Sequence, residues 1–430
     1  MLRVLRNRTY RHLFIAQVVA LVGTGLATVA LSLLAYDLAG ADASAVLGTA
    51  LAIKMVAYVG IAPLVAAFAT RIPRRTLLAG SDLIRTGVAL ALPFVTQVWQ
   101  IYVLIFLLQA ASAAFTPTFQ ATIPELLKDE RDYTQALTLS RLAYDLESLF
   151  SPVLAAGLLS LITYNWLFMG TVFGFLASAA FVVFVVLPKP QPVERTGGPF
   201  AAATFGARLF GKAPQLRALL ALNLAVAAGG AMVIVNTVVL ARDYLQRGAG
   251  DTSLALGAFG AGSMAVALLL PRVLTRVGDR TVMLSGAYTL VGGLLTVTAT
   301  LAAGVFSWPV MLAAWAVLGA ATAAVLTPTG RLIRRSVAPA DLPAAFAAQF
   351  SLSHAAWLLT YPLAGWLASE SGMTAAAATL TVIGLTAAVA TRILWPARVS
   401  PATPRRPRHA PGPRSLRHLH HAHARRRETV

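Results

Sequence analysis

Long apolar segments follow one another along this chain from near the N-terminus to residue 395, and this pattern constrains the fold more than any other feature. A helix needs about 20 apolar residues to cross the hydrocarbon core of a bilayer, and twelve such windows can be placed. Hydrophobic residues make up 57% of the 430 residues and charged residues only 12%, with a mean hydropathy of +0.72. This composition leaves too few polar residues to coat a soluble globule, so the sequence predicts an all-α membrane protein.

The predicted spans divide at a polar stretch, PKPQPVERTGGPF, which begins at Pro188 and is rich in proline, glycine and charge, as is typical of a linker. We place the spans at about residues 12–36, 44–69, 77–96, 99–121, 136–160, 164–187, 216–240, 252–274, 281–303, 307–328, 343–368 and 373–395. We therefore predict four regions, which are an N-terminal six-helix bundle (1–187), a cytoplasmic linker (188–213), a C-terminal six-helix bundle (214–395) and a basic tail (396–430).

Internal repetition supports a division into two pseudo-symmetric halves. Three ordered segments of the first half recur about 210 residues later, which is the signature of a repeat architecture. The pairs are Thr70–Arg75 with Thr275–Arg280, Thr116–Thr118 with Thr327–Thr329, and Ser140–Pro152 with Ser351–Pro362. Each pair occupies the same place in its half, so we expect the halves to share one fold.

The chain is strongly basic, with a net charge of +19 and an isoelectric point of 11.3, which is the footprint of many nucleic-acid binders. Lysine and arginine, however, cluster on alternate connections between the spans, which is the positive-inside pattern of membrane proteins. We expect a lipid bilayer and no nucleic acid as partner, both termini in the cytoplasm, and a location in a bacterial inner membrane. The basic N-terminus has no small-residue cleavage site, so we expect it to remain as the first span.

The predicted fifth span carries charge at a depth where lipid would surround it. Its stretch from Ser140 to Gly157 contains Arg141, Asp145 and Glu147. An ionisable side chain near the bilayer centre costs about 2.5 to 3.5 kcal/mol on insertion scales and normally faces a bundle interior or a wet path. Arg141 and Asp145 are four residues apart and share a helix face, so they can form an ion pair that neutralises both. Glu147 points about 200° away from Asp145 and cannot easily share that partner.

A carboxylate in a low-dielectric interior binds a proton more readily than one in water, which a proton-coupled carrier requires. We expect the coupling site at Asp145 or Glu147, with no preference between them. Lys54 in the second span and His354 in the eleventh also fall near mid-depth. Lys54 either snorkels or pairs with a carboxylate, and His354 is a hydrogen-bonded core residue, a metal ligand or a proton relay. The proton-coupling candidates are thus Arg141, Asp145, Glu147, Lys54 and His354.

The loop after the second span resembles, in part, the signature G-x-x-x-D-R-x-G-R-R of the major facilitator superfamily. The residues that fit are Arg71, Arg74 and Arg75, and those that depart are Ala66, Thr70 and Pro73, which replace Gly, Asp and Gly. The resemblance implies two six-helix bundles that rock about a central site, with Arg71, Arg74 and Arg75, and Arg276 and Arg280 of the second half, in gating loops. In the family, that Asp joins a charge relay that latches the cytoplasmic side, so Thr70 departs from this detail.

Three stretches look like the drug-and-metabolite exporter branch of that superfamily: RNRTYRHLFIAQ leading into the first span, YDLAG at its outer end, and FTPTFQATIPELL after the fourth. SPVLAAG, from Ser151 to Gly157, is similar to the span-five motif G-P-x-x-G-G of exporters and retains Pro152. Small residues there would let the fifth and eighth spans approach closely. A nearer likeness is to nickel-resistance exporters, which carry a histidine-rich cytoplasmic tail. The tail of this chain holds five of the seven histidines, His409, His418, His420, His421 and His423; it is either a metal site or a disordered basic extension.

The resemblance also implies that the first, fourth, seventh and tenth spans line a central cavity. The side chains on them that a substrate would meet are Gln17, Gln109, Gln120, Asn223, Asn236, Tyr36 and Phe115. The alternative for each polar residue is a hydrogen bond between helices. Glycines of the eighth span, such as Gly262, are expected to serve helix packing.

These observations predict a secondary active exporter that works by alternating access and proton antiport. The lead substrate is a divalent metal such as nickel, the alternative is a drug or metabolite, and a non-transporting membrane sensor is the competing class. We find no phosphate-binding loop and no catalytic constellation, so we expect no enzyme and no cofactor. The absence of cysteine excludes disulfides and thiolate metal sites. We expect a monomer.

Overall fold

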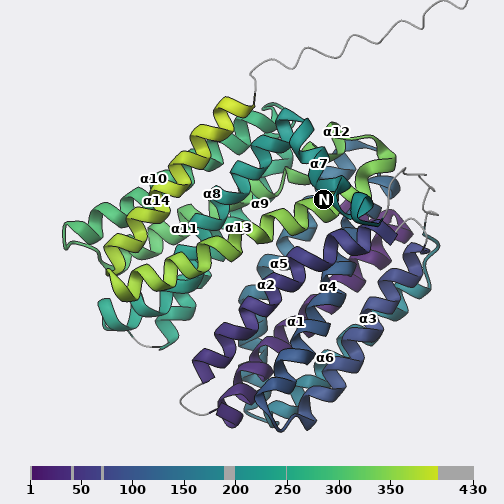
Figure 1. Ribbon diagram of the computed structural model, residues 1–430, viewed down its shortest axis with the longest axis horizontal. Coiled ribbons are helices and arrows are strands. Elements are labelled where there is room, and N and C mark those ends of the chain that lie inside the picture. The colour runs from purple at the N-terminus through teal and green to yellow at the C-terminus, as the bar shows by residue number, and fades with distance from the viewer. Residues whose placement is uncertain (1, 40–42, 69–71, 188–198, 248, 396–430) are drawn as a thin grey trace, which may run out of the picture. The chain divides into compact units, whose positions relative to one another are not determined.

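The computed structural model describes residues 2–39, 43–68, 72–187, 199–247 and 249–395, and every regular element in these ranges is a helix (Figure 1). The long helices are α1 (Arg8–Ala39), α2 (Ala43–Phe68), α3 (Arg74–Ala91), α4 (Val98–Leu126), α5 (Glu130–Leu159), α6 (Tyr164–Val183), α8 (Pro214–Val239), α9 (Ala249–Val273), α10 (Asp279–Ala302), α11 (Trp308–Leu326), α13 (Leu342–Glu370) and α14 (Met373–Leu394). The shorter elements are η1 (Leu2–Arg6), η3 (Leu92–Phe94), α7 (Pro199–Lys212), the π-helix η4 (Leu240–Tyr244), α12 (Thr329–Ser336) and η5 (Pro339–Asp341).

The long helices correspond one for one to the twelve predicted spans. Nine helical stretches of the described ranges are long and apolar enough to cross a membrane. Of the other three, α2 contains a shorter apolar stretch, Thr49–Val65, whereas α5 and α13 have 30 and 29 residues but more polar side chains. The prediction of an all-α, multi-pass membrane protein is confirmed, and the tail from residue 396 lies outside the described residues.

The packing of the helices repeats between the halves. In the first half, α1 packs on α5 and α6, α3 packs on α4 and α6, and α2 packs on α4. In the second half, α8 packs on α13 and α14, α10 packs on α11 and α14, and α9 packs on α11. Replacing each helix of the first set by its repeat partner gives the second set, so the two six-helix bundles are pseudo-symmetric.

The most extensive contacts between the bundles pair α2 with α13 and α5 with α9, and α4 also packs on α13. The first two pairs are equivalent under the repeat, because α2 corresponds to α9 and α5 to α13. Helices in lipid gain little from the hydrophobic effect and associate through close packing and interhelical hydrogen bonds. The polar residues of α5 and α13 therefore lie on helices that join the halves.

Glycines set the closest contacts within each bundle. A methyl group on Gly174 of α6 would lie 3.1 Å from both the carbonyl oxygen of Val19 and the Cα atom of Gly23 in α1. In the second bundle, methyl groups on Gly262 of α9 and Gly319 of α11 would overlap carbonyl oxygens of the opposite helix. This confirms the packing role expected of Gly262.

Two short helices were not predicted. Helix α7 lies within the predicted linker, where Phe210 is fully buried and Gly206 lets the helix pack on α13. Helix α12 follows α11 after Pro328, whose ring cannot donate the backbone hydrogen bond that would continue a helix. The apolar pattern alone did not reveal α7, because its flanking residues are polar and rich in proline.

We predict that Gly319→Ala lowers the melting temperature of the purified protein in detergent by about 2 °C or more, because overpacking a tight contact costs about 1–3 kcal/mol. Gly292→Ala is the matched control, since a methyl group on this glycine of α10 meets nothing within 4 Å. It should leave the melting temperature unchanged or raise it, as alanine favours helix by about 1 kcal/mol. Equal melting temperatures for the two variants would contradict the proposed contact.

Candidate functional site

The charged face of α5 meets α9 of the other bundle at a closed polar contact. Nη2 of Arg141 lies 2.8 Å from Oδ1 of Asp145, which confirms the predicted pair on one helix face. Ser263 of α9 completes it, because its hydroxyl accepts hydrogen bonds from Nε and Nη2 of Arg141 at 3.1 and 2.8 Å and donates one to Oδ2 of Asp145 at 2.8 Å. Opposite charges on α5 are therefore neutralised by each other and tied to the second bundle.

Glu147 has a different environment from Asp145. It lies half-buried beside Gly25 of α1, where a methyl group on that glycine would lie 3.1 Å from Oε1 of Glu147. Within the described residues it has no hydrogen bond and no ion pair shorter than 4 Å. Lys54 of α2 lies close enough for its charge to act on the carboxylate. Asp145 is thus a structural partner of Arg141, whereas Glu147 faces a cation at a distance.

The second contact between the bundles, α2 with α13, is aromatic. The ring of Tyr58 lies 4.7 Å from that of Phe350 and 4.6 Å from the imidazole of His354, centre to centre. The Tyr58 hydroxyl donates a hydrogen bond to Oε1 of Gln109 at 2.8 Å, which fixes the ring against α4. Lys54, one turn before Tyr58, holds its ammonium nitrogen 5.6 Å from the centre of the Tyr58 ring.

The hydrogen bond of His354 defines its tautomer. Nδ1 lies 2.6 Å from the carbonyl oxygen of Phe350. A carbonyl oxygen only accepts hydrogen bonds, so Nδ1 carries the proton. This leaves the lone pair of Nε2 as the acceptor when the imidazole is neutral. His354 is therefore a hydrogen-bonded residue of the junction, and its Nε2 is the atom that a proton or a ligand would meet.

The polar residues predicted to line a cavity fall into two groups. Asn223 and Gln349 exchange reciprocal hydrogen bonds of 3.1 and 3.0 Å, and Asn236 is buried against α13 with a 3.5 Å contact to the carbonyl oxygen of Ala364. These asparagines serve helix packing, which was the stated alternative. Gln17 is also buried and accepts from Ser140 at 3.2 Å.

The remaining predicted lining residues have mixed outcomes. Gln109 belongs to the aromatic junction, and Gln120 is half-buried on α4. The Tyr36 side chain lies outside the described residues. Phe115 is buried in the core of the first bundle against the guanidinium of Arg85, 4.4 Å from its ring centre, so we remove it from the lining residues. Sequence reasoning missed this buried Arg85, although D-x-x-R in an apolar span was visible.

Arg85 belongs to a buried polar cluster between α3, α4 and α6. Its Nη2 lies 2.7 Å from Oδ1 of Asp82, and the hydroxyl of Ser178 donates to Oδ2 of Asp82 at 2.6 Å. The guanidinium also lies 4.8 Å from the centre of the Phe175 ring. The pair is confined to one bundle, so it stabilises the bundle rather than the contact between halves.

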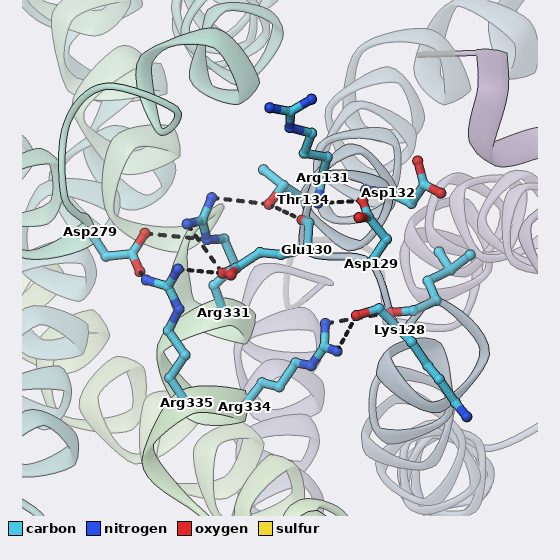
Figure 2. Close-up of polar contacts among 11 residues, drawn as sticks. Lys128, Asp129, Glu130, Arg131, Asp132, Thr134, Asp279, Arg331, Arg334 and Arg335 are labelled. Atoms are coloured by element: carbon cyan, nitrogen blue, oxygen red, sulfur yellow. Dashed lines mark hydrogen bonds and ion pairs between the residues drawn. The ribbon is translucent and has the colours of Figure 1, made fainter. Parts of the chain in front are cut away.

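At the end where α1, α3 and α5 begin, which we name the basic end, a network of charges links the two bundles (Figure 2). Nη2 of Arg335 lies 2.5 Å from Oε1 of Glu130, and its Nη1 lies 2.6 Å from Oδ2 of Asp279. Arg331 contacts the same two carboxylates at 3.3 and 3.4 Å and donates to the Thr134 hydroxyl at 3.0 Å. Glu130 is thus the acid of the first bundle that holds two arginines of the second.

A second link lies beside this network. Nη2 of Arg334 donates to the carbonyl oxygen of Lys128 at 2.7 Å, and its guanidinium lies 5.0 Å from the ring centre of Tyr133. Asp129 accepts hydrogen bonds from the backbone of Arg131 and Asp132 and so begins α5, which places Glu130 in the first turn. Figure 2 shows Arg331, Arg334 and Arg335 of α12 facing this turn.

The arginines predicted to form the gate do not make these contacts. Arg74 forms a two-fold ion pair with Glu125 of its own bundle, with both N–O distances 2.5 Å. Arg280 donates to the carbonyl oxygen of Trp395, also in its own bundle. Arg75 and Arg276 are exposed, and Arg71 lies outside the described residues. Of the two predicted loops, the one after α9 supplies Asp279 to the network, whereas Arg74 beside the other pairs within its own bundle; the cross-bundle arginines lie on α12.

Gly157 of the span-five motif makes no close helix contact. Gly157 is exposed, and a methyl group on it would meet nothing within 4 Å. The Pro152 side chain lies outside the described residues. In this structure α5 and α9 meet nearer the basic end, at Arg141, Asp145 and Ser263. Among the described residues, no three histidine, aspartate or glutamate side chains gather to hold a metal ion, and the five tail histidines lie outside those residues.

The comparisons with known proteins agree with this architecture. The sequence pattern described as Major Facilitator Superfamily matches residues 13–286 and 219–428, and no curated protein matches the chain significantly in sequence. The crystal structure of the human organic anion transporter MFSD10 (TETRAN) is similar, with a TM-score of 0.78 and 14% identity, over 89% of this chain and 99% of that one.

The crystal structure of FucP, a Major Facilitator Superfamily transporter in the outward conformation, is also similar, with a TM-score of 0.68 and 13% identity, over 90% of this chain and 98% of that one. At these identities the likeness shows the fold. The sequence match, the repeat and the paired helices of the two bundles lead to one conclusion. The chain belongs to the Major Facilitator Superfamily and is a membrane transporter, not an enzyme.

Proposed function

We propose that this transporter exports a solute in exchange for protons, and that Glu147 is the residue that carries the proton. The observation that supports this assignment is the contrast between the two carboxylates of α5. Asp145 has Arg141 and Ser263 as close partners, so a proton there would break a closed ionic contact. Glu147 has neither kind of close partner among the described residues and lies at mid-helix, where α1, α2 and α5 meet.

Exchange follows if proton and solute compete for the same carboxylate. An uncompensated carboxylate in a low-dielectric interior is costly, so it favours either a proton or a cation. A transporter that changes conformation only when Glu147 is neutralised would move one or the other on each half-cycle. This is antiport, because the proton and the solute cannot occupy the Glu147 carboxylate at the same time.

The basic end is proposed to face the cytoplasm, in a bacterial inner membrane, because arginine and lysine concentrate there as the positive-inside pattern requires. Glu130, Arg331, Arg334 and Arg335 join the bundles at that end. Closure at the cytoplasmic end leaves the opposite end as the path by which an external proton reaches Glu147. This is the state expected of a transporter waiting to be loaded with a proton from outside.

The described residues favour an organic solute over nickel. The ammonium of Lys54, whose charge acts on Glu147, lies against the ring of Tyr58, which packs on the rings of Phe350 and His354. Nickel instead prefers several nitrogen or oxygen ligands. The nickel hypothesis rests on the tail histidines. The organic anions named for MFSD10 are a third class of solute to test, because the positive charge of Lys54 would attract an anion.

We predict that Glu147→Gln abolishes solute-driven proton movement, because the amide cannot bind an exchangeable proton at this place. Purified protein in liposomes that contain a pH-sensitive dye would be challenged with tetraphenylphosphonium, benzyltrimethylammonium and Ni²⁺, and the proton flux should fall to that of empty liposomes. Glu370→Gln, at the exposed end of α13, should behave as the unmodified protein. Full proton flux in Glu147→Gln would rule out this residue.

We predict that deleting residues 396–430 leaves transport of organic cations unchanged. If nickel is a substrate loaded by the tail histidines, the truncated chain should instead lose protection of cells from nickel. Growth on graded nickel, cobalt and lipophilic cations separates the two substrates. Protection from nickel that survives the deletion would remove the tail from transport.

We predict that Glu130→Gln shifts the transporter away from closure at the basic end, because Arg331 and Arg335 lose their acid from the first bundle. Glu130 is 46% exposed, so its ion pairs with Arg331 and Arg335 are screened by solvent. Each is worth about 0.2–1 kcal/mol, and losing both should change the population of two states by about twofold to thirtyfold. The chain has no cysteine, so one introduced at Leu137, where Gly330 packs, reports opening through its rate of thiol labelling.

The matched control is Glu125→Gln, which breaks the pair with Arg74 inside one bundle. It should leave the labelling rate at Leu137→Cys unchanged. Equal labelling in the Glu130 and Glu125 variants would show that the charge network does not hold the bundles together.

A further inference from the structure

Lys54 holds a positive charge at an unusual place. Its ammonium lies 5.6 Å from the centre of the Tyr58 ring, in the middle of α2, and its charge acts on Glu147. Among the described residues it makes no hydrogen bond and no ion pair shorter than 4 Å. An ammonium group carries three donors, and burying them without acceptors is costly. A lysine in this position therefore suggests that its positive charge has a function there.

The surroundings of the ammonium form a site suited to a cation. Its base is the face of an aromatic ring, which attracts cations through its quadrupole. The ring is fixed by the hydrogen bond from Tyr58 to Gln109 and by the rings of Phe350 and His354. The carboxylate of Glu147, free of any close partner in the described ranges, supplies the negative charge. We name Lys54, Tyr58 and Glu147, together with these rings, the cation site.

We propose that the cation site binds the cationic head group of the transported solute, and that Lys54 is a tethered substitute that fills it while the transporter is empty. The inference rests on the proposed exchange at Glu147 and adds the class of solute and the residue that competes with it. The solute is an organic monocation, such as a substituted ammonium ion with an aromatic or aliphatic body.

The distances explain why Lys54 can be displaced. No N–O distance between Lys54 and Glu147 is as short as 4 Å, so the two charges attract each other without forming a direct ion pair. A free cation that reaches the carboxylate directly gains the stronger interaction, since Coulomb energy rises as distance falls. The flexible four-carbon stem of lysine lets the ammonium move aside without moving α2.

The charged and titratable groups around Glu147 are consistent with this role. They are Lys54 and Tyr58 from α2, and Tyr144 on α5 itself; α1 contributes Gly25, which has no side chain. His354 of α13 faces Lys54, and Arg85 of α3 acts on Tyr58. Lys54 is thus the cation that acts on Glu147, and removing it leaves the carboxylate for the solute or a proton.

The cation site does not match the other two classes of solute. A divalent metal ion needs several nitrogen or oxygen ligands, whereas this site offers one carboxylate and a ring face. An anion would bind Lys54 and leave Glu147 with a second negative charge nearby. That arrangement would favour proton binding together with the anion, which gives cotransport rather than exchange.

The test is binding of benzyltrimethylammonium to the full-length protein in detergent at pH 8, measured by calorimetry. Lys54→Met, which keeps the length of the side chain but removes the charge, should bind the probe about tenfold more tightly, because the competitor is gone. Lys54→Arg keeps the competitor and should bind within about twofold of the unmodified protein. Unchanged or weaker binding in Lys54→Met would overturn the proposal.

Two variants of Tyr58 test the ring in the Lys54→Met background. Tyr58→Phe keeps the aromatic face and should retain most of the affinity for the probe. Tyr58→Leu should bind about fivefold more weakly, because cation–π contacts contribute about 0.5 to 2 kcal/mol. Equal affinity in the Phe and Leu variants would remove the ring from the site. The melting temperature of each variant distinguishes lost binding from lost folding.

An anionic probe separates this inference from the proposed function. If benzenesulfonate binds the unmodified protein and Lys54→Met loses that binding, Lys54 is an anion-binding residue and the cation site is overturned, while proton carriage by Glu147 still stands. Conversely, tighter cation binding in Lys54→Met supports the cation site even if Glu147→Gln retains proton flux, and then only the proposed exchange fails.

Discussion

The structure depends on the compensation of charges within the membrane. A carboxylate or guanidinium taken out of water costs several kcal/mol unless a partner lies close. Arg141, Asp145 and Ser263 solve this at the contact of α5 with α9, where each polar group of the three has a partner within 3.1 Å. Because Ser263 belongs to the second bundle, the same contact that neutralises α5 also joins the halves.

The two junctions between the bundles are equivalent in the repeat but differ in chemistry. The α5–α9 junction is ionic and closed. The α2–α13 junction combines aromatic rings, with Lys54 beside them, and a hydrogen bond from the Ser351 hydroxyl to the carbonyl oxygen of Val59. The first ties the bundles through directional bonds that are lost if the helices separate. The second relies mainly on contacts between ring faces, with one hydrogen bond beside them. The two junctions therefore join the bundles by different chemistry.

Much of the fold could be predicted, because the number of spans, the repeat and the ion pair of Arg141 with Asp145 all follow from sequence patterns. The partners that each bundle receives from the other half could not be predicted. Ser263 is a small uncharged residue in a span rich in glycine and alanine, so its sequence context does not indicate a partner for α5. Helix α12 directly follows an apolar span, so the sequence pattern does not separate the two helices. Which arginine meets Glu130 depends on how two bundles pack, and spacing along one helix carries no such information. The motif therefore indicated gating loops but named Arg74 and Arg280, which serve their own bundles.

The environment of Glu147 shows why sequence position could not rank it against Asp145. Both carboxylates lie near the middle of one helix, two residues apart, and face different neighbours only after folding. Asp145 contacts the Ser263 hydroxyl of α9, whereas Glu147 lies beside Gly25 of α1. A methyl group at Gly25 would crowd the carboxylate and the neighbouring Ser151. The absent side chain at Gly25 thus lets α5 pack closely against α1 beside Glu147, because the Ser151 side chain occupies the position that a methyl group would take.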